Sequence, residues 1–202
     1  MQQHPRFRPD RRFTLRALAL SPLAAILVST AVPAAAQDMR QAEGVLAQIH
    51  GTTWIAEGQG KRVLTIFFDP NCPYCHKLYG MLRADVGKDD LQLRWVPLGM
   101  LTPSSLPKAA AILQAKDPLQ AFHQNENDYD FAANGQPGGG IEPATAITPK
   151  VRQDLARNLA VYSSNKLFGV PVMVWTKVDG SAALLTGVPS AAALSSILRS
   201  VR

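Results

Sequence analysis

The chain has 202 residues, 47% of them hydrophobic, with 21 Lys+Arg, 15 Asp+Glu and two cysteines. Its net charge of +6 is concentrated at the amino terminus, because residues 1–36 hold five arginines and one aspartate, which leaves 16 basic and 14 acidic side chains in residues 37–202. The longer part has no basic stripe with interleaved aromatic residues, which argues against nucleic-acid binding. Its length suits one domain with its own core.

Residues 1–36 have the pattern of a cleavable export signal. A basic segment is followed by an apolar stretch over 17–32 and by three alanines at 34–36. The alternative is a membrane anchor, but Pro22 and neighbouring serines interrupt the apolar stretch before it reaches roughly 20 residues. We therefore expect a periplasmic protein after cleavage. The export route stays open between Sec and twin-arginine, because the pattern around the pair at 11–12 matches a twin-arginine signal only in part.

Residues 37–62 precede the first long apolar run. Apolar positions at helical spacing predict a helix over 38–50, and a short edge strand is expected at 52–55. The run VLTIFF at 63–68 is apolar almost throughout, which is typical of a strand at a central or parallel position of a sheet.

Residues 63–202 are predicted to form one α/β domain. A strand, a helix and a strand come first, then a helical stretch over about 104–165, then two strands and a closing helix. Residues 178–181 (VDGS) predict a hairpin between the last two strands, and the glycine-rich stretch 134–140 a surface loop. Beyond the first strand, the expected bounds are helix 72–86, strand 91–97, helices 105–115, 118–127 and 149–165, strands 170–177 and 182–186, and helix 190–201.

The only two cysteines, Cys72 and Cys75, fall at the predicted junction between the strand 63–68 and the next helix. A disulfide between them would close a loop too small to stabilise a fold of this size. Pro73 suits a first helical turn, which places Cys72 at the helix N-cap. The spacing therefore indicates a chemical role for the pair.

A helix N-terminus lowers the pKa of a cysteine thiol, which is otherwise near about 8.5, because unpaired N–H groups favour the thiolate. Cys72 is thus the predicted nucleophile. Cys75, one turn further and more buried, is expected to resolve a mixed disulfide. The reaction would need no metal and no cofactor beyond a redox-active Cys72–Cys75 disulfide. We expect Pro73 to stiffen the turn and Tyr74 to contact substrate. His76 is expected to be an exposed helix residue that contributes to stabilising the thiolate, with a general base as the alternative.

The segments FFDPNCPYCHKLY (67–79) and FGVPVMVW (168–175) resemble the thioredoxin-fold domain of the DsbC/DsbG family of exported thiol:disulfide interchange proteins, with the CPYC form closer to DsbG. The likeness extends from about Trp54 to the carboxyl terminus and includes LRWVP at 93–97 and GVP at 187–189. It implies a thioredoxin fold, with a central mixed sheet flanked by helices and a helical insertion at about 104–165.

The resemblance also implies features of the site and its partners. A cis peptide bond between Val170 and Pro171 would lie in a loop against the cysteines and expose backbone for an extended substrate segment. Exported proteins with cysteines would be the substrates, and a membrane electron donor of the DsbD type would keep the dithiol reduced for reductase or isomerase activity. The alternative is a disulfide-donating oxidase of the same fold.

Two departures from the family stand out. Residues 37–62 are too few for the separate N-terminal dimerisation domain, so we expect a monomer rather than a V-shaped dimer. Position 170 is valine where the family has threonine, which could change both the redox potential and the choice of partners.

Other readings of the motif remain open. Residues 72–76 match the haem-attachment pattern CxxCH of c-type cytochromes, although the preceding buried strand and the Val170-Pro171 motif argue against it. A structural zinc site would need more ligands than two cysteines and His76. A non-catalytic module that binds thiol-bearing clients is a third possibility. Asp69 is expected to be a turn residue after the strand, with a tuning role on the dithiol as the alternative.

Overall fold

The computed structural model describes residues 34–131 and 138–202. Most of the predicted signal and part of the predicted loop at 134–140 lie outside these residues. No helix within the described ranges is long and apolar enough to cross a membrane. The elements are, in chain order, α1 (Ala34–Gln48), η1 (Ile49–Gly51), β1 (Ile55–Glu57), β2 (Arg62–Phe68), α2 (Pro73–Leu82), η2 (Lys88–Asp90), β3 (Leu91–Pro97), α3 (Ser105–Gln114), α4 (Pro118–Asn127), α5 (Pro149–Ser164), β4 (Val172–Thr176), β5 (Ala182–Thr186) and α6 (Ala191–Ser200).

A mixed five-stranded sheet runs through the described part of the chain in the order β1-β3-β2-β4-β5. Strand β2 pairs with β3 in parallel and with β4 antiparallel, so that Leu64 lies between Leu93 and Trp175. Because β2 has neighbours on both sides and helices on both faces, its apolar run has no solvent-facing side. The predicted central strand, the antiparallel hairpin of β4 and β5, and the α/β class with a central mixed sheet are confirmed.

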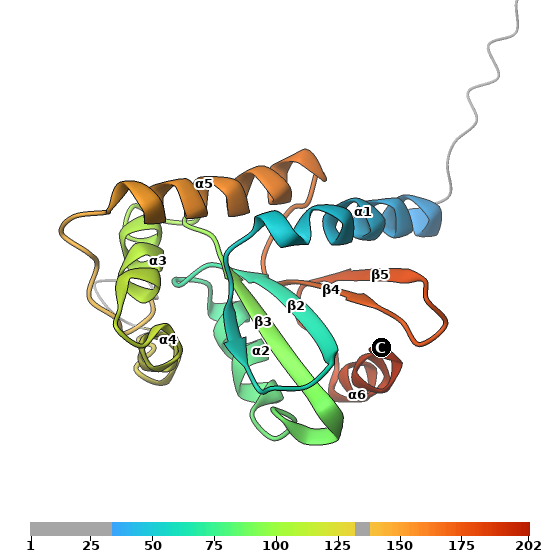
Figure 1. The fold of residues 1–202 in the computed structure, drawn as a ribbon. Helices are drawn as coiled ribbons and strands as arrows, with labels where there is room; N and C mark the ends of the chain where they lie inside the picture. Colours follow the sequence, from blue (N-terminus) through green and yellow to red (C-terminus); the bar gives the residue numbers. More distant parts are fainter. Residues whose placement is uncertain (1–33, 132–137) are drawn as a thin grey trace, which may run out of the picture. The chain divides into compact units, whose positions relative to one another are not determined.

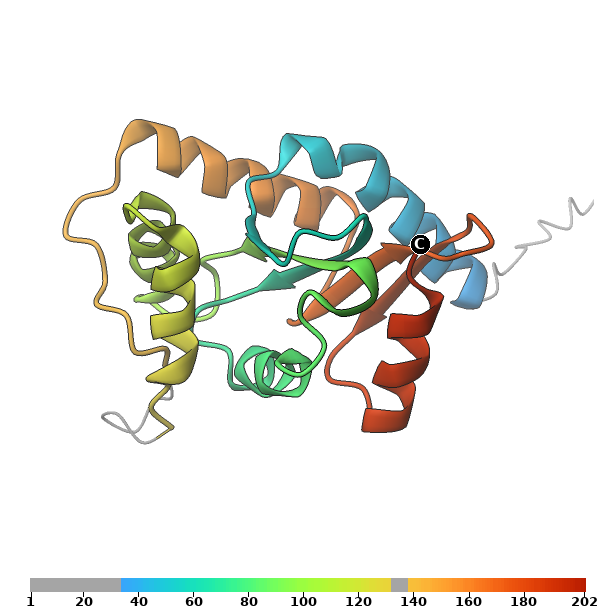
Figure 2. The same ribbon diagram turned by 60° about the horizontal axis from the view of Figure 1, so that its bottom comes forward.

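Helices cover both faces of the sheet. Helices α1 and α5 lie on one face, and α2 and α6 lie on the other (Figures 1 and 2). Phe68 of β2 packs edge-on against Trp95 of β3 and Phe122 of α4, with ring centroids 5.9 and 5.0 Å apart. All three side chains are fully buried. Helix α4 therefore contributes to the main core, although it belongs to the insertion between β3 and β4.

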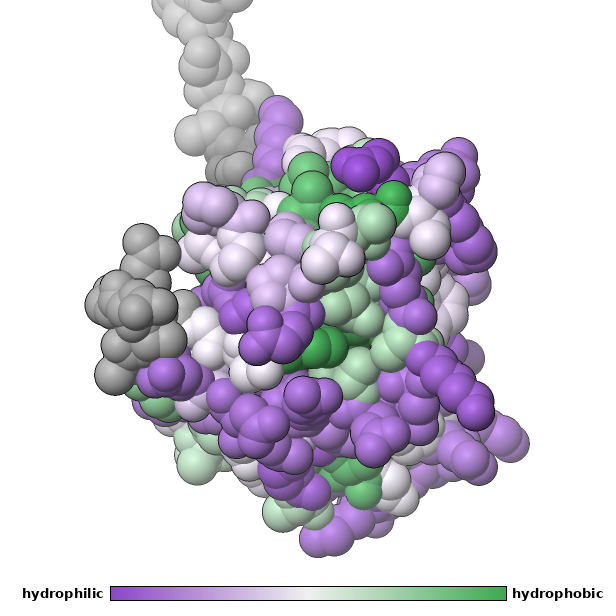
Figure 3. Space-filling model, turned by 90° about the vertical axis from the view of Figure 1, so that its left-hand side faces the viewer, coloured by the Kyte–Doolittle hydropathy of each residue, from purple (hydrophilic) through white to green (hydrophobic). Residues whose placement is uncertain are grey.

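Helices α3, α4 and α5 fill the predicted insertion of about 104–165. Thr148 caps α5 by accepting a hydrogen bond from the N–H of Val151, and Asp117 caps α4 by accepting one from the N–H of Gln120. Seen from the side of α3 and α4, the surface is mostly hydrophilic, with small apolar areas between polar side chains (Figure 3). The insertion thus buries one side against the sheet and presents a largely polar side to water.

Several predicted bounds differ from the structure. Helix α2 ends at Leu82 rather than near Val86, because the chain turns after Arg83 and reverses at Gly87, whose φ of +72° is left-handed. Strand β1 begins only at Ile55, since Thr53 is held by Asn158 of α5. Elsewhere, α1 begins at Ala34 and β4 at Val172.

Candidate active site

The two cysteines lie where β2 ends and α2 begins. Cys72 is the N-cap of α2 with an extended backbone, and its sulfur accepts a hydrogen bond from the N–H of Cys75 at 3.2 Å. Pro73 occupies the first helical turn. Both cysteines are free thiols in the structure, with 2% and 1% of their surface exposed. The junction therefore holds two sulfur atoms side by side at the edge of the core.

A loop from the far end of the chain closes over Cys72. The peptide bond between Val170 and Pro171 is cis, as the resemblance implies, and the Val170 carbonyl oxygen lies 3.4 Å from the Cys72 sulfur. Gly169 adopts a φ of +67°, and its carbonyl accepts a hydrogen bond from the hydroxyl of Tyr162 at 2.8 Å. The loop is thus anchored to α5 on one side and rests on the dithiol on the other.

The surroundings shift the pKa values of the two thiols in opposite directions. The pKa of Cys72 is lowered, chiefly by a hydrogen bond from the Cys75 side chain and further by the backbone N–H groups of Cys75 and Tyr74, against burial and the Asp69 charge. The pKa of Cys75 is raised well above its usual value, first by burial and then by Cys72. Cys72 is therefore the thiol more easily ionised, which suits the nucleophile of an exchange reaction.

Asp69 is more than a turn residue. Its buried carboxylate does accept the local N–H of Asn71, but it also accepts the Ser105 hydroxyl at 2.6 Å and the N–H groups of Met100 and Leu101 at 2.8 and 3.1 Å. It thereby ties the segment before Cys72 to the loop after β3 and to the start of α3. The expectation of a simple turn was too narrow, because the partners come from residues about 30 positions later.

The insertion holds the same segment from another direction. The carbonyl oxygen of Pro70 accepts hydrogen bonds from Asn125 of α4 and from the N–H of Gly139, both at 3.1 Å. The hydroxyl of Tyr129 donates to the carbonyl of Asn71 at 2.9 Å. Hydrogen bonds to α3, to α4 and the residues after it, and to the loop at 139 therefore hold the segment that precedes Cys72 in place.

His76 is not the exposed helix residue that we expected. Its ring stacks on Tyr129 with centroids 4.7 Å apart and meets Phe131 edge-on at 5.3 Å, so that 28% of its side chain is exposed. Its Nδ1 lies 3.7 Å from a carboxylate oxygen of Glu126, which is buried. The neighbouring carboxylate raises the pKa of His76, while burial raises the pKa of Glu126. Residues of the insertion thus surround the side of α2 that follows Cys75.

Glu126 and Asn125 were not predicted from the sequence as parts of the site. One signal could have suggested their burial, because they stand four residues after Ala121 and Phe122 and so share one face of α4. That spacing predicts which side of the helix is buried. It does not predict that this side meets His76 and the backbone before Cys72.

Three aromatic side chains in the segments that build the site are exposed. Tyr74 is 63% exposed, and Phe131, whose ring meets His76 edge-on, is 60% exposed. Phe168, which precedes the loop of Val170, is 76% exposed. The three rings come from separate segments of the chain. Tyr74 stands between the two cysteines, Phe131 contacts His76, and Phe168 stands two positions before Val170.

A family model described as a thioredoxin-like domain matches residues 52–202. The chain belongs to the thioredoxin-like family. The match covers β1 through α6 and therefore includes both cysteines, the Val170-Pro171 loop and the helical insertion.

Relatives within the thioredoxin-like family confirm the predicted resemblance to DsbG. The chain is 31% identical over 149 residues to the thiol:disulfide interchange protein DsbG of Pseudomonas aeruginosa, which covers 73% of this chain and 56% of that protein. It is 36% identical over 75 residues to DsbG of Escherichia coli, which covers 36% of this chain and 30% of that protein. The chain thus spans about half or less of the length of these relatives.

A solved thioredoxin-like structure shows the same fold at lower identity. A linker-deletion variant of ScsC from Proteus mirabilis superposes with a TM-score of 0.60 and 22% identity, over 82% of this chain and 83% of that one. A periplasmic thioredoxin-like protein from Salmonella enterica serovar Typhimurium gives 0.52 and 19%, over 77% and 94%. At these identities the likeness establishes the fold alone.

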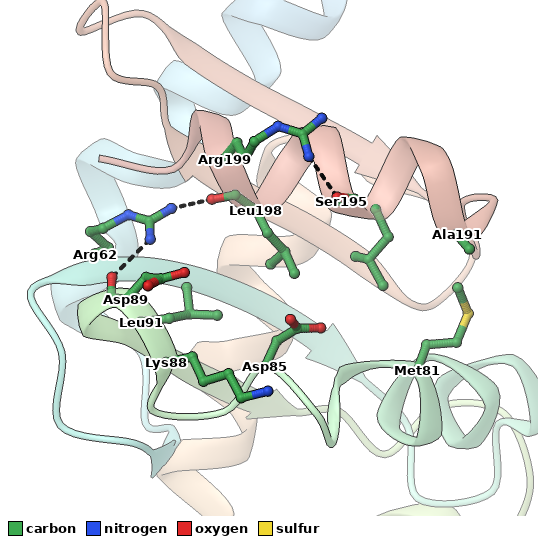
Figure 4. A pocket seen from close by; sticks show the side chains of 11 residues that line it. Arg62, Met81, Asp85, Lys88, Asp89, Leu91, Ala191, Ser195, Leu198 and Arg199 are labelled. Carbon is green, nitrogen blue, oxygen red and sulfur yellow. Dashed lines mark hydrogen bonds between the residues drawn. The ribbon is translucent and has the colours of Figure 1, made fainter.

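A hollow of about 640 Å³ lies away from the dithiol, between α6 and the turn that follows α2 (Figure 4). Asp85 lines it from the turn and Leu194 from α6, and neither cysteine contributes to it. The guanidinium group of Arg62 donates to the backbone oxygens of Asp89 and Leu198 at its rim. We infer that these contacts help to hold α6 in place, because the guanidinium group of Arg62 is already hydrogen-bonded to backbone oxygens.

Proposed function

We propose that this protein exchanges disulfides with exported protein substrates through Cys72 and Cys75. The observation that carries the proposal is the asymmetry of the pair, in which Cys72 has a lowered pKa beside the Val170 carbonyl while Cys75 lies fully buried behind it. The Cys72 thiolate would attack a substrate disulfide, form a mixed disulfide and release one substrate thiolate. Cys75 would then attack the Cys72 sulfur, release the second substrate thiolate and leave the Cys72–Cys75 disulfide.

The direction that we favour is reductase or isomerase, with oxidase as the alternative. The similarity to proteins named DsbG supports this choice. In this direction a membrane electron donor of the DsbD type would return the disulfide to the dithiol. A periplasmic location and a monomeric chain complete the proposal, with no metal and no further cofactor required by the chemistry above.

The substrate side of the site has two parts in this proposal. The backbone at Val170 and Pro171 would pair with an extended substrate segment beside Cys72. Tyr74, exposed next to the nucleophile, would contact the residues that flank the substrate cysteine. Pro73 would fix the first turn of α2. His76, which follows Cys75 in the chain, would tune the reactivity of the dithiol.

Trapping tests the exchange reaction directly. A Cys75→Ser variant expressed in the periplasm should accumulate mixed disulfides with client proteins on Cys72, visible as adducts that vanish on reduction. A Cys72→Ser variant, which keeps the buried thiol but lacks the nucleophile, is the matched control and should form none. If Cys75→Ser yields no adduct, the chain binds clients without exchange.

The redox state of the pair in the cell tests direction. Acid quenching followed by alkylation measures the fraction of molecules with a reduced pair. A dithiol in most molecules would support the reductase or isomerase role, and so would a shift to the disulfide when the membrane donor is deleted. A disulfide in most molecules would instead identify an oxidase.

A further inference from the structure

One hydroxyl group of the insertion holds the loop of residues 168–170, which joins α5 to β4 (Figure 1). The hydroxyl of Tyr162 on α5 donates to the carbonyl oxygen of Gly169 at 2.8 Å. Among the described residues, the only other hydrogen bond to the backbone of this loop runs from the Cys72 thiol to the Val170 carbonyl. A thiolate or a disulfide has no hydrogen on that sulfur and cannot make it. The bond from Tyr162 then holds the loop alone.

Packing fixes the position of the Tyr162 side chain. The residue is 5% exposed, and its ring lies 6.1 Å from that of Phe67 in β2, measured between centroids. Burial raises the pKa of the hydroxyl to about 12, with a further contribution from Cys75, so the hydroxyl keeps its proton and remains a donor at neutral pH. The backbone carbonyl of Tyr162 also accepts the N–H of Leu167 at 3.2 Å. Tyr162 therefore contacts the loop and the residue that leads into it.

We propose that Tyr162 is a positioning residue, whose hydroxyl keeps the loop of residues 168–170 against Cys72 in the geometry that an extended client segment requires. This inference rests on the proposed exchange reaction. The N–H groups of Gly169 and Val170 have no hydrogen-bond partner among the described residues, so the backbone of a client can pair with them. A loop that already has its bound geometry loses less conformational freedom when the client arrives, which strengthens binding.

The same hydrogen bond acts on the nucleophile through the loop. The Val170 carbonyl lies 3.4 Å from the Cys72 sulfur, and only 2% of Cys72 is exposed. The contact favours the protonated thiol, since the carbonyl can accept a hydrogen bond from it but not from the thiolate. Loss of the Tyr162 hydroxyl should therefore have two opposite effects. Client segments would bind less well, while Cys72 would ionise more easily and become more accessible to small reagents.

Two disulfide probes with the same leaving group separate these effects. The first probe is dithiobis(nitrobenzoate), which is small and has no peptide backbone. The second is a short extended peptide whose single cysteine forms a disulfide with nitrothiobenzoate. With either probe the Cys72 thiolate forms a new bond to one sulfur, the disulfide of the probe breaks, and the coloured nitrothiobenzoate thiolate leaves with the electron pair. The difference between the probes therefore reports the contribution of the peptide backbone.

Tyr162→Phe keeps the ring and removes only the hydroxyl. We expect the peptide concentration that gives half the maximal rate to rise about three- to tenfold, the factor that one neutral hydrogen bond typically contributes, and the maximal rate not to fall. The reaction with dithiobis(nitrobenzoate) should be as fast as in wild type or faster. The pKa of Cys72, measured from the rate of alkylation against pH, should be lower than in wild type.

Two further variants complete the comparison. Tyr79→Phe is the matched control, because Tyr79 is also 5% exposed and its hydroxyl lies 2.8 Å from Nδ1 of His123 and donates to Asn127 at 3.1 Å, not to the loop. It should change none of the three readouts. Gly169→Ala disturbs the same bond from the acceptor side, because a φ of +67° is strained for a residue with a side chain. It should shift the readouts in the same directions as Tyr162→Phe, and it serves if that variant folds poorly.

Several outcomes would overturn the proposal. An unchanged half-saturating peptide concentration in Tyr162→Phe does so, and so does a pKa of Cys72 that is unchanged or higher. Equal slowing with both probes also overturns it, because that would indicate damage to Cys72 itself. The pKa readout needs no client. If the wild-type protein reacts with dithiobis(nitrobenzoate) but not with the peptide, exchange with extended clients fails, and the pKa of Cys72 in Tyr162→Phe still decides the role of Tyr162.

Discussion

The sulfur of Cys72 lies 3.4 Å from the carbonyl oxygen of Val170, 98 positions further along the chain. A protonated thiol can donate to this carbonyl, whereas a thiolate cannot. The N–H of Cys75 acts in the opposite sense, since it donates to the same sulfur and favours the thiolate. Cys72 therefore lies between one group that favours its protonated form and another that favours its ionised form.

The Cys75 side chain should hold the pKa of Cys72 below its usual value. The largest cause that lowers this pKa is the hydrogen bond from the Cys75 side chain. Cys75→Ala removes that donor and leaves the backbone N–H groups in place, so the pKa of Cys72 should rise. Thiolate absorbance or alkylation rate followed against pH measures this value. Cys75→Ser, which keeps a donor, is the control and should show a smaller rise. An equal pKa in wild type and Cys75→Ala would mean that the backbone alone stabilises the thiolate.

Asp69 should be worth several kcal/mol of stability. Asp69→Ala leaves two part-buried N–H groups of the loop after β3 and the buried Ser105 hydroxyl without their acceptor, and we expect the free energy of unfolding to drop by about 3 to 5 kcal/mol. Urea denaturation measures the change. Asp179 accepts a similar local hydrogen bond from the N–H of Ser181 at an exposed turn, so Asp179→Ala should leave the free energy of unfolding nearly unchanged. Similar losses in the two variants would contradict the importance of the buried network.

Gly139 is predicted to be intolerant of a side chain. A Cβ there would lie 2.0 Å from Oδ1 of Asn125, and the collision would push that amide away from the carbonyl of Pro70. We expect Gly139→Ala to destabilise the protein by about 1 to 3 kcal/mol. Gly80 on α2 has no atom within 4 Å of the corresponding position, so Gly80→Ala should instead stabilise by about 0.5 to 1 kcal/mol. Urea midpoints that move in the same direction for both variants would refute the prediction.

The pair of His76 and Glu126 should make stability depend on pH. The pKa of His76 is raised in the folded protein, so its contribution is complete below the unfolded value of about 6.5 and is lost as the pH rises through the folded value. The pKa of Glu126 is also raised, so its contribution is likewise lost as the pH rises from the unfolded value of about 4.3. Both groups therefore make the free energy of unfolding fall with rising pH.

Denaturation at a series of pH values tests this slope. Glu126→Gln removes one titrating group and the cause of the shift at His76, so it should flatten the decline between about pH 4.3 and the range above 6.5. Glu142 is an exposed glutamate of the same insertion, so Glu142→Gln is the control and should keep the wild-type slope. A decline that persists unchanged in Glu126→Gln would show that other groups produce it.

The local elements of this protein could be predicted from the sequence because each depends on near neighbours. Strand β3 and helix α4 have the predicted bounds, since alternating apolar residues and the pair Asp117-Pro118 define them locally. Cys72 falls at the N-cap for the same reason, because Pro73 fits the first turn. The dithiol and its place at a strand-to-helix junction were therefore determined by the sequence itself.

The tertiary structure alone decided what surrounds the dithiol. Asp69 reaches Ser105 across 36 positions, and His76 meets Glu126 only because α4 folds back against α2. Local spacing carries no information about such pairs, since they depend on how Phe122 packs the insertion into the core beside Phe68. Because of that packing, His76 is the neighbour of a buried carboxylate and not an exposed helix residue.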